Sequence, residues 1–97
     1  MKNKFKKIRS WAKKRDLYKK GDVKTQFLKL QEEIGELAEA LLNKDEIEIQ
    51  DAIGDIVVVL TNLAWLADYK IEDCIEHAYE EIKDRKGKME NGTFKKI

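Results

Sequence analysis

Two helical segments whose carboxylates border an apolar stripe constrain this chain more than any other feature. In the first, apolar residues recur at intervals of three and four between Leu30 and Leu41, which is the period of a buried helical face. Glu33 and Glu36 are three residues apart at the edge of that stripe, so their side chains project together. Carboxylates crowded beside an apolar face repel each other and resist burial. A divalent cation would relieve both effects.

A second acidic cluster lies on the following helical segment. Asp51 and Asp55 are four residues apart, and Glu48 precedes Asp51 by three. Asn62 lies two turns beyond Asp55, so these four side chains fall within one narrow stripe. The short connection at residues 43–45 makes the two segments antiparallel neighbours, and both clusters lie about two turns from it. The sequence therefore predicts that the carboxylates converge on one shared metal site.

The charge balance limits the classes of partner. Charged residues make up 40% of the 97-residue chain but nearly cancel, which leaves a net charge of +1. A general nucleic-acid-binding protein is usually clearly basic, so we expect no stable nucleic-acid partner. The most apolar stretch, Ile56 to Ala67, is too short and too interrupted to span a bilayer. We therefore expect no membrane partner.

Cysteine usage and the N-terminal sequence bear on the compartment. The single cysteine, Cys74, excludes an internal disulfide framework and fits a reducing compartment. We expect its side chain to be a small buried apolar group. The basic start of the chain is not followed by an apolar run, so no signal peptide is evident. These features predict a cytoplasmic protein.

Hydrophobic periodicity predicts an all-α fold. The chain has no proline, which favours uninterrupted helices. Asp22 and Asp45 are placed to act as N-caps of the second and third helices. We expect a single domain, residues 1–97, whose last part, 87–97, is a flexible basic tail. The predicted helices form a four-helix bundle and cover about residues 3–18, 23–42, 46–68 and 71–86.

The third predicted helix is apolar nearly all round between Ile56 and Leu66, so more than one of its sides should be buried. A chain of this length with four helices can hardly cover it. Gly54 costs about 1 kcal/mol of helix propensity, which indicates a close helix approach or a site that needs room. We therefore expect a homo-oligomer with this helix at or near the subunit interface.

Residues near the first acidic cluster are candidates for ligand binding. Gln26 and Lys29 share a helical face with Glu33. Lys29 either meets a phosphate or forms a surface pair with Glu33, and Gln26 is placed to hydrogen-bond a base or a sugar. Trp11 either joins the core or stacks on a planar ligand.

The donor set indicates a hard cation. A site of carboxylates without cysteine or histidine suits Mg²⁺, or Mn²⁺ as a substitute, and Mg²⁺ held in this way binds substrate phosphates. Lys83 and Arg85 belong to a basic run that is either solvated or closes over a triphosphate. From the residues alone we expect metal-dependent hydrolysis of a phosphoanhydride, with one carboxylate free to act as a general base.

Two segments carry a resemblance to a known family. They read Glu32-Glu33-Ile34-Gly35-Glu36-Leu37-Ala38-Glu39-Ala40 and, at a fitting distance, Asp51-Ala52-Ile53-Gly54-Asp55-Ile56. Together they resemble the MazG family of all-α nucleoside triphosphate pyrophosphohydrolases, most closely its short phage-type members. The likeness covers nearly the whole chain. The family signature is Glu-Glu-x-x-Glu, a spacer and Glu-x-x-Asp, and its first half matches at Glu32, Glu33 and Glu36.

The second half of the signature departs from the family. With Asp55 as the final aspartate, the family's glutamate falls on Ala52. Either Asp51, one residue earlier, replaces that glutamate, or Glu48 and Asp51 form the Glu-x-x-Asp pair themselves and the metal is shifted by one turn.

The resemblance implies cleavage of a nucleoside triphosphate between its α- and β-phosphates, which yields a nucleoside monophosphate and pyrophosphate and removes non-standard or surplus nucleotides. It implies a dimer or tetramer. It assigns the catalytic pair to Glu32 and Glu33, with Glu32 as ligand or base. The metal ligands that it implies are Glu33, Glu36, Asp55 and, as a substitute, Asp51. The expected substrate contacts are Trp11, Gln26, Lys29, Asn62, Lys83 and Arg85.

Two other classes of function stay open on the sequence. The chain is either an active enzyme, or an inactive relative that binds nucleotides, which Ala52 favours, or a helical interaction module with solvated acidic stripes. Stabilisation by Mg²⁺ and nucleotide separates the first two from the third, and turnover separates the enzyme from the binder.

Overall fold

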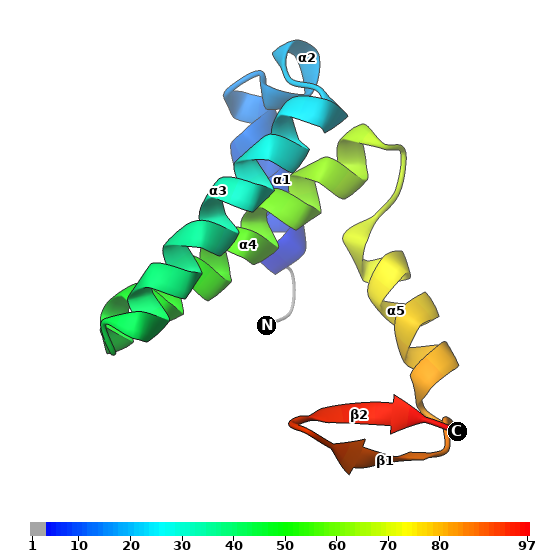
Figure 1. Ribbon diagram of the computed structural model, residues 1–97. Coiled ribbons are helices and arrows are strands. Elements are labelled where there is room, and N and C mark those ends of the chain that lie inside the picture. Colours follow the sequence, from blue (N-terminus) through cyan, green and yellow to red (C-terminus); the bar gives the residue numbers. More distant parts are fainter. Residues whose placement is uncertain (1–3) are drawn as a thin grey trace.

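The computed structural model describes residues 4–97, which form five helices and a terminal β-hairpin (Figure 1). The helices are α1 (Lys4–Lys14), α2 (Leu17–Lys20), α3 (Val23–Leu42), α4 (Glu46–Leu66) and α5 (Ile71–Ile82), and the strands are β1 (Gly87–Glu90) and β2 (Thr93–Lys96). The chain is therefore mostly helical, as predicted. The predicted start of the first helix, residue 3, lies outside the described residues.

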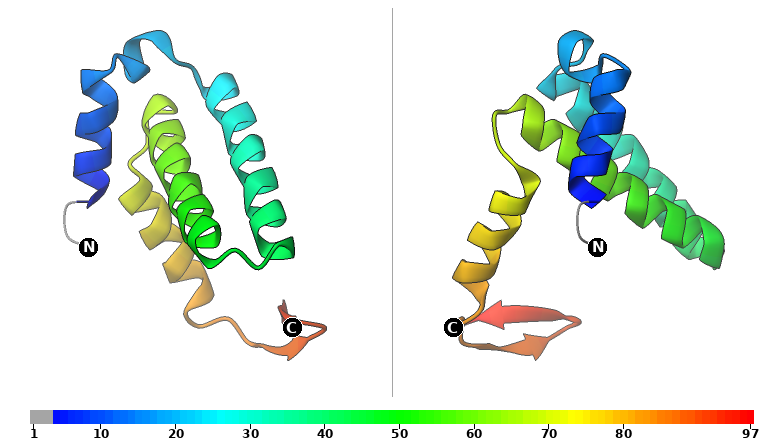
Figure 2. Two further views of the ribbon diagram at one scale, coloured as in Figure 1. Left: turned by 90° about the vertical axis from the view of Figure 1, so that its left-hand side faces the viewer. Right: turned by 180° about the vertical axis from the view of Figure 1, so that it is seen from behind.

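The helical hairpin of α3 and α4 forms the centre of the molecule. Asp22 caps α3 by accepting a hydrogen bond from the Thr25 amide at 2.7 Å, and Asp45 caps α4 by accepting one from the Glu48 amide at 3.2 Å. Lys44, with φ of 54°, reverses the chain between them. Both predicted N-caps are confirmed, and the two helices run antiparallel and side by side (Figures 1 and 2).

The prediction of one helix over residues 3–18 is wrong beyond Lys14. Asp16 adopts a left-handed backbone conformation, with φ of 61°, which aspartate tolerates better than most residues. The chain changes direction there and begins α2. As a result Tyr18 lies against α4, where its hydroxyl donates a hydrogen bond to the Asn62 side chain at 2.6 Å.

The expected C-terminal tail is a β-hairpin instead. α5 ends at Ile82 rather than near residue 86, and β1 pairs antiparallel with β2, with Met89 opposite Phe94. Asn91 and Gly92 form its two-residue loop with φ of 52° and 84°, the positive angles of a type I′ turn. The Asn-Gly dipeptide is the sequence signal for this hairpin, and helical periodicity does not reveal it.

One chain does not close into the predicted four-helix bundle. We call α1 to α4 the body and residues 71–97, which hold α5 and the hairpin, the arm. Figures 1 and 2 show the arm leaving the body near the C-terminal end of α4. The radius of gyration is 15.7 Å, against about 12.5 Å for a compact chain of this length. The arm is fastened to the body by Arg9, whose guanidinium donates two hydrogen bonds to Glu72 at 2.7 and 2.6 Å.

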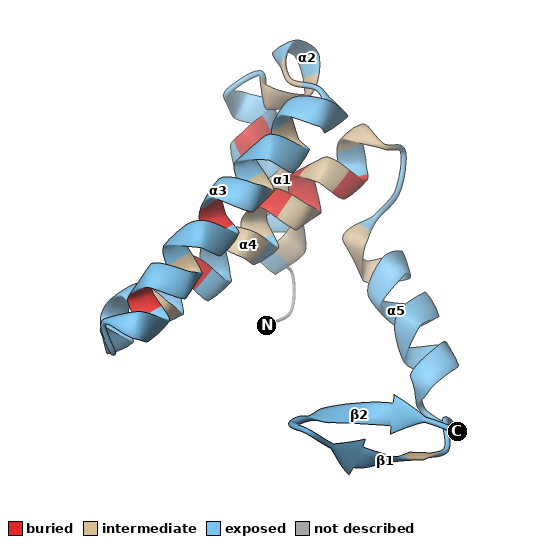
Figure 3. Cartoon of the chain, viewed as in Figure 1, coloured by how far each residue is buried: buried red, intermediate tan, exposed pale blue. Residues whose placement is uncertain are grey.

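Burial is confined to the body (Figure 3). The buried residues are Ala12, Glu33, Ala40, Ala52, Val59, Thr61, Asn62 and Ala64. On α4, Ile53 remains 51% exposed and Trp65 41% exposed, so within one chain α4 is covered on one side rather than nearly all round. Cys74 on α5 is exposed, and the expectation that it is buried is wrong because α5 leaves the body.

α4 is the one helix among residues 4–97 that is long and apolar enough, by length and composition, to cross a membrane, whereas the stretch from Ile56 to Ala67 was predicted to be too short and too interrupted. Core helices of soluble proteins have the same property. Asp51 and Asp55 lie within this helix, and each carboxylate would cost about 2.5–3.5 kcal/mol at a bilayer centre. The most apolar stretch of α4 is 28% buried within one chain, so packing against α3 accounts for only part of its apolar character.

Candidate metal and nucleotide site

Three glutamates of α3 lie close enough together to share a cation. Glu32, Glu33 and Glu36 each offer a carboxylate oxygen, and these oxygens lie within 4.8 Å of one another. Their i, i+1, i+4 spacing on one helix brings them to the same edge. Glu33 faces α4 and is 6% exposed, whereas the other two are exposed.

Glu33 has an unsatisfied oxygen. Its Oε1 lies 3.3 Å from the Lys29 ammonium, but its Oε2 is buried and has no hydrogen-bond partner among residues 4–97. A buried acceptor left without a partner is destabilising, and more so when it carries charge. This oxygen is therefore placed to bind something that the chain itself does not supply.

The charges of the cluster are out of balance. The Glu33 carboxylate raises the pKa of the Glu36 carboxyl above its ordinary value, first because it can accept a hydrogen bond from protonated Glu36 and then because its charge repels the ionised form. Hydrogen bonds to Glu32 and then Glu33 raise the pKa of the Lys29 ammonium. One lysine is thus shared between two carboxylates while the third is pushed toward its protonated form. An oxygen-only set with excess negative charge fits a hard divalent cation.

A hollow of about 310 Å³ between α1, α3 and α4, the central hollow, opens beside Glu33. Asp55 of α4 lies across it, so the two acidic helices do meet at one site. The central hollow gathers six of the predicted site residues. Its walls are Trp11, Leu17, Gln26, Lys29, Glu33, Asp55, Val58, Val59 and Asn62.

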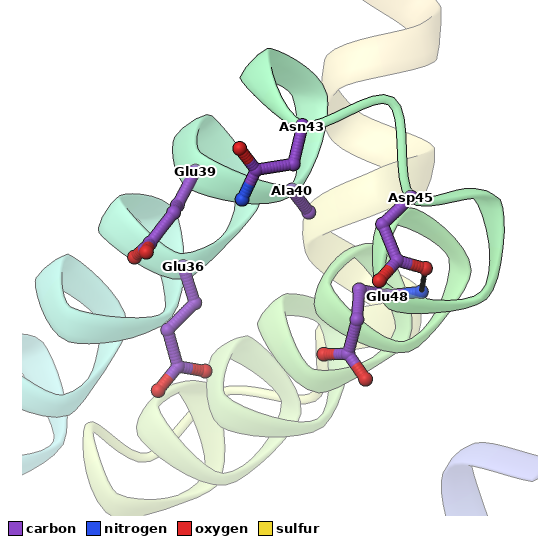
Figure 4. A pocket seen from close by; sticks show the side chains of 6 residues that line it. All are labelled: Glu36, Glu39, Ala40, Asn43, Asp45 and Glu48. Carbon is purple, nitrogen blue, oxygen red and sulfur yellow. Dashed lines mark hydrogen bonds between the residues drawn. The ribbon is translucent and has the colours of Figure 1, made fainter.

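A second hollow, the end hollow, lies nearer the α3–α4 connection and measures about 320 Å³. Figure 4 shows Glu36 of α3 and Glu48 of α4 on its two walls. Its lining consists of Glu36, Glu39, Ala40, Asn43, Asp45 and Glu48. Glu36 belongs to both the end hollow and the glutamate cluster, and so links the two.

The register of α3 and α4 shows where Ala52, which stands in place of the glutamate of the family signature, lies relative to the glutamates of α3. Glu33 shares a hollow with Asp55, and Ala40 shares one with Glu48, so the antiparallel register sets Ala52 opposite Glu36. Ala52 is buried and offers no ligand. Asp51, the predicted substitute, is exposed and lines neither hollow.

Two predicted substrate contacts lie away from these hollows within one chain. Lys83 and Arg85 follow α5 in the arm, and the Lys83 ammonium lies 2.7 Å from a Glu80 carboxylate oxygen.

Trp11 keeps about half of its surface exposed and is covered on one ring face by the Arg15 guanidinium, 4.4 Å from the ring centre. The structure therefore gives Trp11 a place in the hollow wall and leaves the two basic residues outside it.

Sequence reasoning missed Tyr18. Its contact with Asn62 depends on the left-handed turn at Asp16. Periodicity within an assumed continuous helix cannot locate a residue that follows such a turn. Burial raises the pKa of the Tyr18 phenol. The hydroxyl therefore stays protonated and donates a hydrogen bond to the Asn62 side chain.

Residues 22–89, well over half of the chain, match the MazG nucleotide pyrophosphohydrolase domain. This chain belongs to that family. The match confirms the MazG resemblance found in the two acidic segments. It includes α3, α4 and α5 and extends into β1, so the MazG region takes in part of the arm as well as the acidic hairpin.

One curated phage protein shares sequence with part of the chain. It is the "Uncharacterized 18.2 kDa protein in rep-hol intergenic region" of Haemophilus phage HP1 (strain HP1c1), which is 40% identical over 60 residues. The aligned region is 62% of this chain and 37% of that protein, so the chain spans well under half the length of this relative. No solved structure matches the chain.

Proposed function

We propose that this chain is a Mg²⁺-dependent nucleoside triphosphate pyrophosphohydrolase, which cleaves between the α- and β-phosphates to give a nucleoside monophosphate and pyrophosphate. Membership of the MazG family supports the reaction class. The observation that carries the proposal is the unsatisfied buried oxygen of Glu33. It lies beside a hollow that also holds a lysine, two amides and an indole.

The residues present fit a magnesium ion. Glu33, Glu36 and Asp55 would hold it, with Asp51 as the proposed substitute for the family's glutamate. Glu48 shares the end hollow with Glu36 and would be a ligand only if the ion were shifted toward that hollow. When bound, Mg²⁺ would neutralise charge on the phosphates and lower the pKa of a water molecule. Mn²⁺ would offer the same chemistry.

The chain's own groups then bind and orient the substrate. Glu32 is exposed beside Glu33 and pairs with Lys29 at 3.3 Å, and we assign it the role of the base that accepts a proton from the attacking water. Lys29, Gln26, Asn62 and Trp11 all line the central hollow. We assign Lys29 to a phosphate, the two amides to the nucleoside and Trp11 to the base. Removal of surplus or non-standard nucleotides in the cytoplasm is the role we assign to this activity.

We also propose that the protein acts as a homo-oligomer, either a dimer or a tetramer. The arm presents Ile75, Tyr79 and Ile82, each about half exposed, and an isolated two-stranded hairpin is marginally stable in water. On α4, an added Cβ at Gly54 would meet nothing within 4 Å, so the chain makes no close helix approach there, and the free space would admit a second copy. In such an assembly Lys83 and Arg85 of one protomer can serve a partner's hollow.

Pyrophosphate release from a panel of canonical and modified nucleoside triphosphates tests the reaction directly. The assay is run with Mg²⁺, with Mn²⁺ and with EDTA, for the wild type and for Glu36→Ala. We expect metal-dependent release that Glu36→Ala abolishes. No release from any nucleotide, with the wild type matching Glu36→Ala, would contradict the hydrolase proposal, and equal metal-dependent release from both proteins would contradict the role of Glu36.

A nucleotide-binding protein without turnover is the second candidate, and Ala52 is the observation that favours it, because it removes a carboxylate opposite Glu36. This candidate predicts a higher unfolding temperature with Mg²⁺ and nucleotide, but no pyrophosphate. A helical interaction module predicts neither effect.

A further inference from the structure

Asn62 is a buried amide at the end of the central hollow remote from the carboxylates. It is 2% exposed and lines the hollow from α4. A buried amide is costly unless it is hydrogen-bonded. Its partner is Tyr18, and the length of that bond decides which end of the amide faces the tyrosine.

The bond from the Tyr18 hydroxyl to Asn62 Oδ1 is 2.6 Å long. That length belongs to O–H···O bonds, whereas N–H···O bonds are most often 2.9–3.0 Å. The amide oxygen is therefore occupied by the tyrosine. The amide NH₂, which can only donate, is the end of Asn62 left for a ligand in the hollow.

The side-chain amides of Gln26 and Asn62 lie away from the carboxylates by about the length of a nucleoside. Asn62 follows Asp55 by seven residues on α4, and Gln26 precedes Glu33 by seven on α3, so each lies about 10 Å along its helix from the acidic level. Because the helices are antiparallel, both amides line the same end of the hollow. A nucleotide with its phosphates at the carboxylates brings its base to this end, and the base edge remote from the sugar meets Asn62.

We propose that Asn62, oriented by Tyr18, selects nucleoside triphosphates whose base carries a keto oxygen at its remote edge over those with an amino group there. This inference rests on the proposed function and adds the substrate class. A keto oxygen accepts from the amide NH₂. An amino group at the same position would face the amide NH₂, and neither donor would find an acceptor. Two unpaired donors in a buried site are costly, so a base with that amino group should be rejected. Tyr18 touches neither substrate nor metal and acts as a positioning residue.

The test compares dUTP with dCTP, which have nearly the same shape and differ at the remote edge. We expect the wild type to favour dUTP by about tenfold or more in kcat/KM. In Tyr18→Phe the amide is free to rotate, so the ratio should fall toward one while hydrolysis persists. The matched control is Tyr69→Phe, which alters an exposed tyrosine and should leave the ratio unchanged.

A second variant keeps the test independent of any loss of stability in Tyr18→Phe. Asn62→Asp preserves the shape and the bond from Tyr18 but presents an acceptor to the hollow, so the preference should shift toward dCTP. Thermal unfolding of each variant shows whether it is folded. A wild type that favours dCTP or neither, or an unchanged ratio in both folded variants, overturns the inference.

Binding separates this inference from the hydrolase proposal. Calorimetric titration with the α,β-imido analogues of dUTP and dCTP, in the presence of Mg²⁺, measures the preference without turnover. Tighter binding of the uracil analogue, relaxed in Tyr18→Phe, supports the inference even if no pyrophosphate is released. Equal binding of the two analogues overturns the inference alone, and no binding of either overturns both proposals.

Discussion

The body and the arm both contain charged and apolar residues, but they differ in which of these residues are buried. In the body, Glu33 and Asn62 are buried polar groups, and each lies at a hollow. In the arm, the apolar stripe through Ile75 and Ile82 is exposed, and no residue of α5 is buried. The body therefore supplies the chemistry within a single chain, whereas the arm has apolar surface that a single chain does not cover. The difference is consistent with the proposed homo-oligomer, in which a second copy would cover the exposed apolar side chains of the arm.

The largest expected effect separates a carboxylate of the body from one of the arm. Glu36→Gln removes a proposed ligand, whereas Glu76→Gln removes an exposed acid of α5. Loss of a direct ligand should exceed the 10–100-fold typical of outer partners, so we expect pyrophosphate release to fall at least about 100-fold in Glu36→Gln and to be unchanged in Glu76→Gln. Equal pyrophosphate release from the two variants would contradict the proposal that the body, and not the arm, holds the metal ligands.

The same substitution should act in the opposite direction on metal-free stability. The pKa of Glu36 is raised above its ordinary value, so the folded state disfavours its ionised form and loses stability as the pH rises through that pKa. Glu36→Gln should therefore unfold at a slightly higher temperature than the wild type at pH 7 in EDTA. It should also gain less from added Mg²⁺.

Introducing charge into the arm should dissociate the oligomer. Ile75 is half exposed on α5, and full burial of such a side chain against a second copy contributes about 1.5–3 kcal/mol. We expect Ile75→Glu to shift the mass in sedimentation velocity from oligomer to monomer, with Glu76→Gln as the matched control. A wild type that sediments as a monomer would contradict the assembly.

Restoring the missing carboxylate should strengthen metal binding. Ala52→Glu places a side chain opposite Glu36, where the family has its glutamate. We expect Mg²⁺ affinity to rise by about tenfold, in line with the effect of single groups around a metal, and the metal-free protein to lose stability through carboxylate repulsion. Titration calorimetry and unfolding in EDTA check the two effects, and unchanged affinity would count against the proposed register.

The smallest effect concerns the junction between arm and body. Hydrogen bonds from Arg9 lower the pKa of Glu72 from 4.5 to about 2. Because the folded pKa is depressed, this pair stabilises the fold above about pH 4.5, and the contribution is lost as the pH falls through about 2. We expect Glu72→Gln to cost about 1 kcal/mol or less at pH 7 and to flatten the acid limb of the stability curve. Urea unfolding at pH 7 and pH 3 measures this difference.

Helical periodicity and capping chemistry were sufficient to predict the α3–α4 hairpin. Asp22 and Asp45 are the caps that the structure shows. The spacing of Glu33 from the connection placed it opposite Asp55, and both line the central hollow. These predictions succeeded because they depend on local sequence and on the fixed rise of a helix.

The remaining features depend on information that periodicity does not carry. The turn at Asp16 is a single left-handed residue, and it alone brings Tyr18 to Asn62. The hairpin in the arm was readable from Asn91 and Gly92 but not from helical spacing. Helical periodicity identified the apolar stripe of α5 but not the surface that this stripe packs against, so it did not predict that α5 leaves the body.

Crystals grown with Mn²⁺ and a non-hydrolysable nucleoside triphosphate give the most direct test of the account. An anomalous difference map locates the metal without reference to activity. The account predicts a peak at coordination distance from the buried Glu33 Oε2, shared with Glu36 and Asp55, and the base at the Asn62 end of the central hollow. A peak confined to the end hollow between Glu39 and Glu48, or no peak near Glu33, would contradict it.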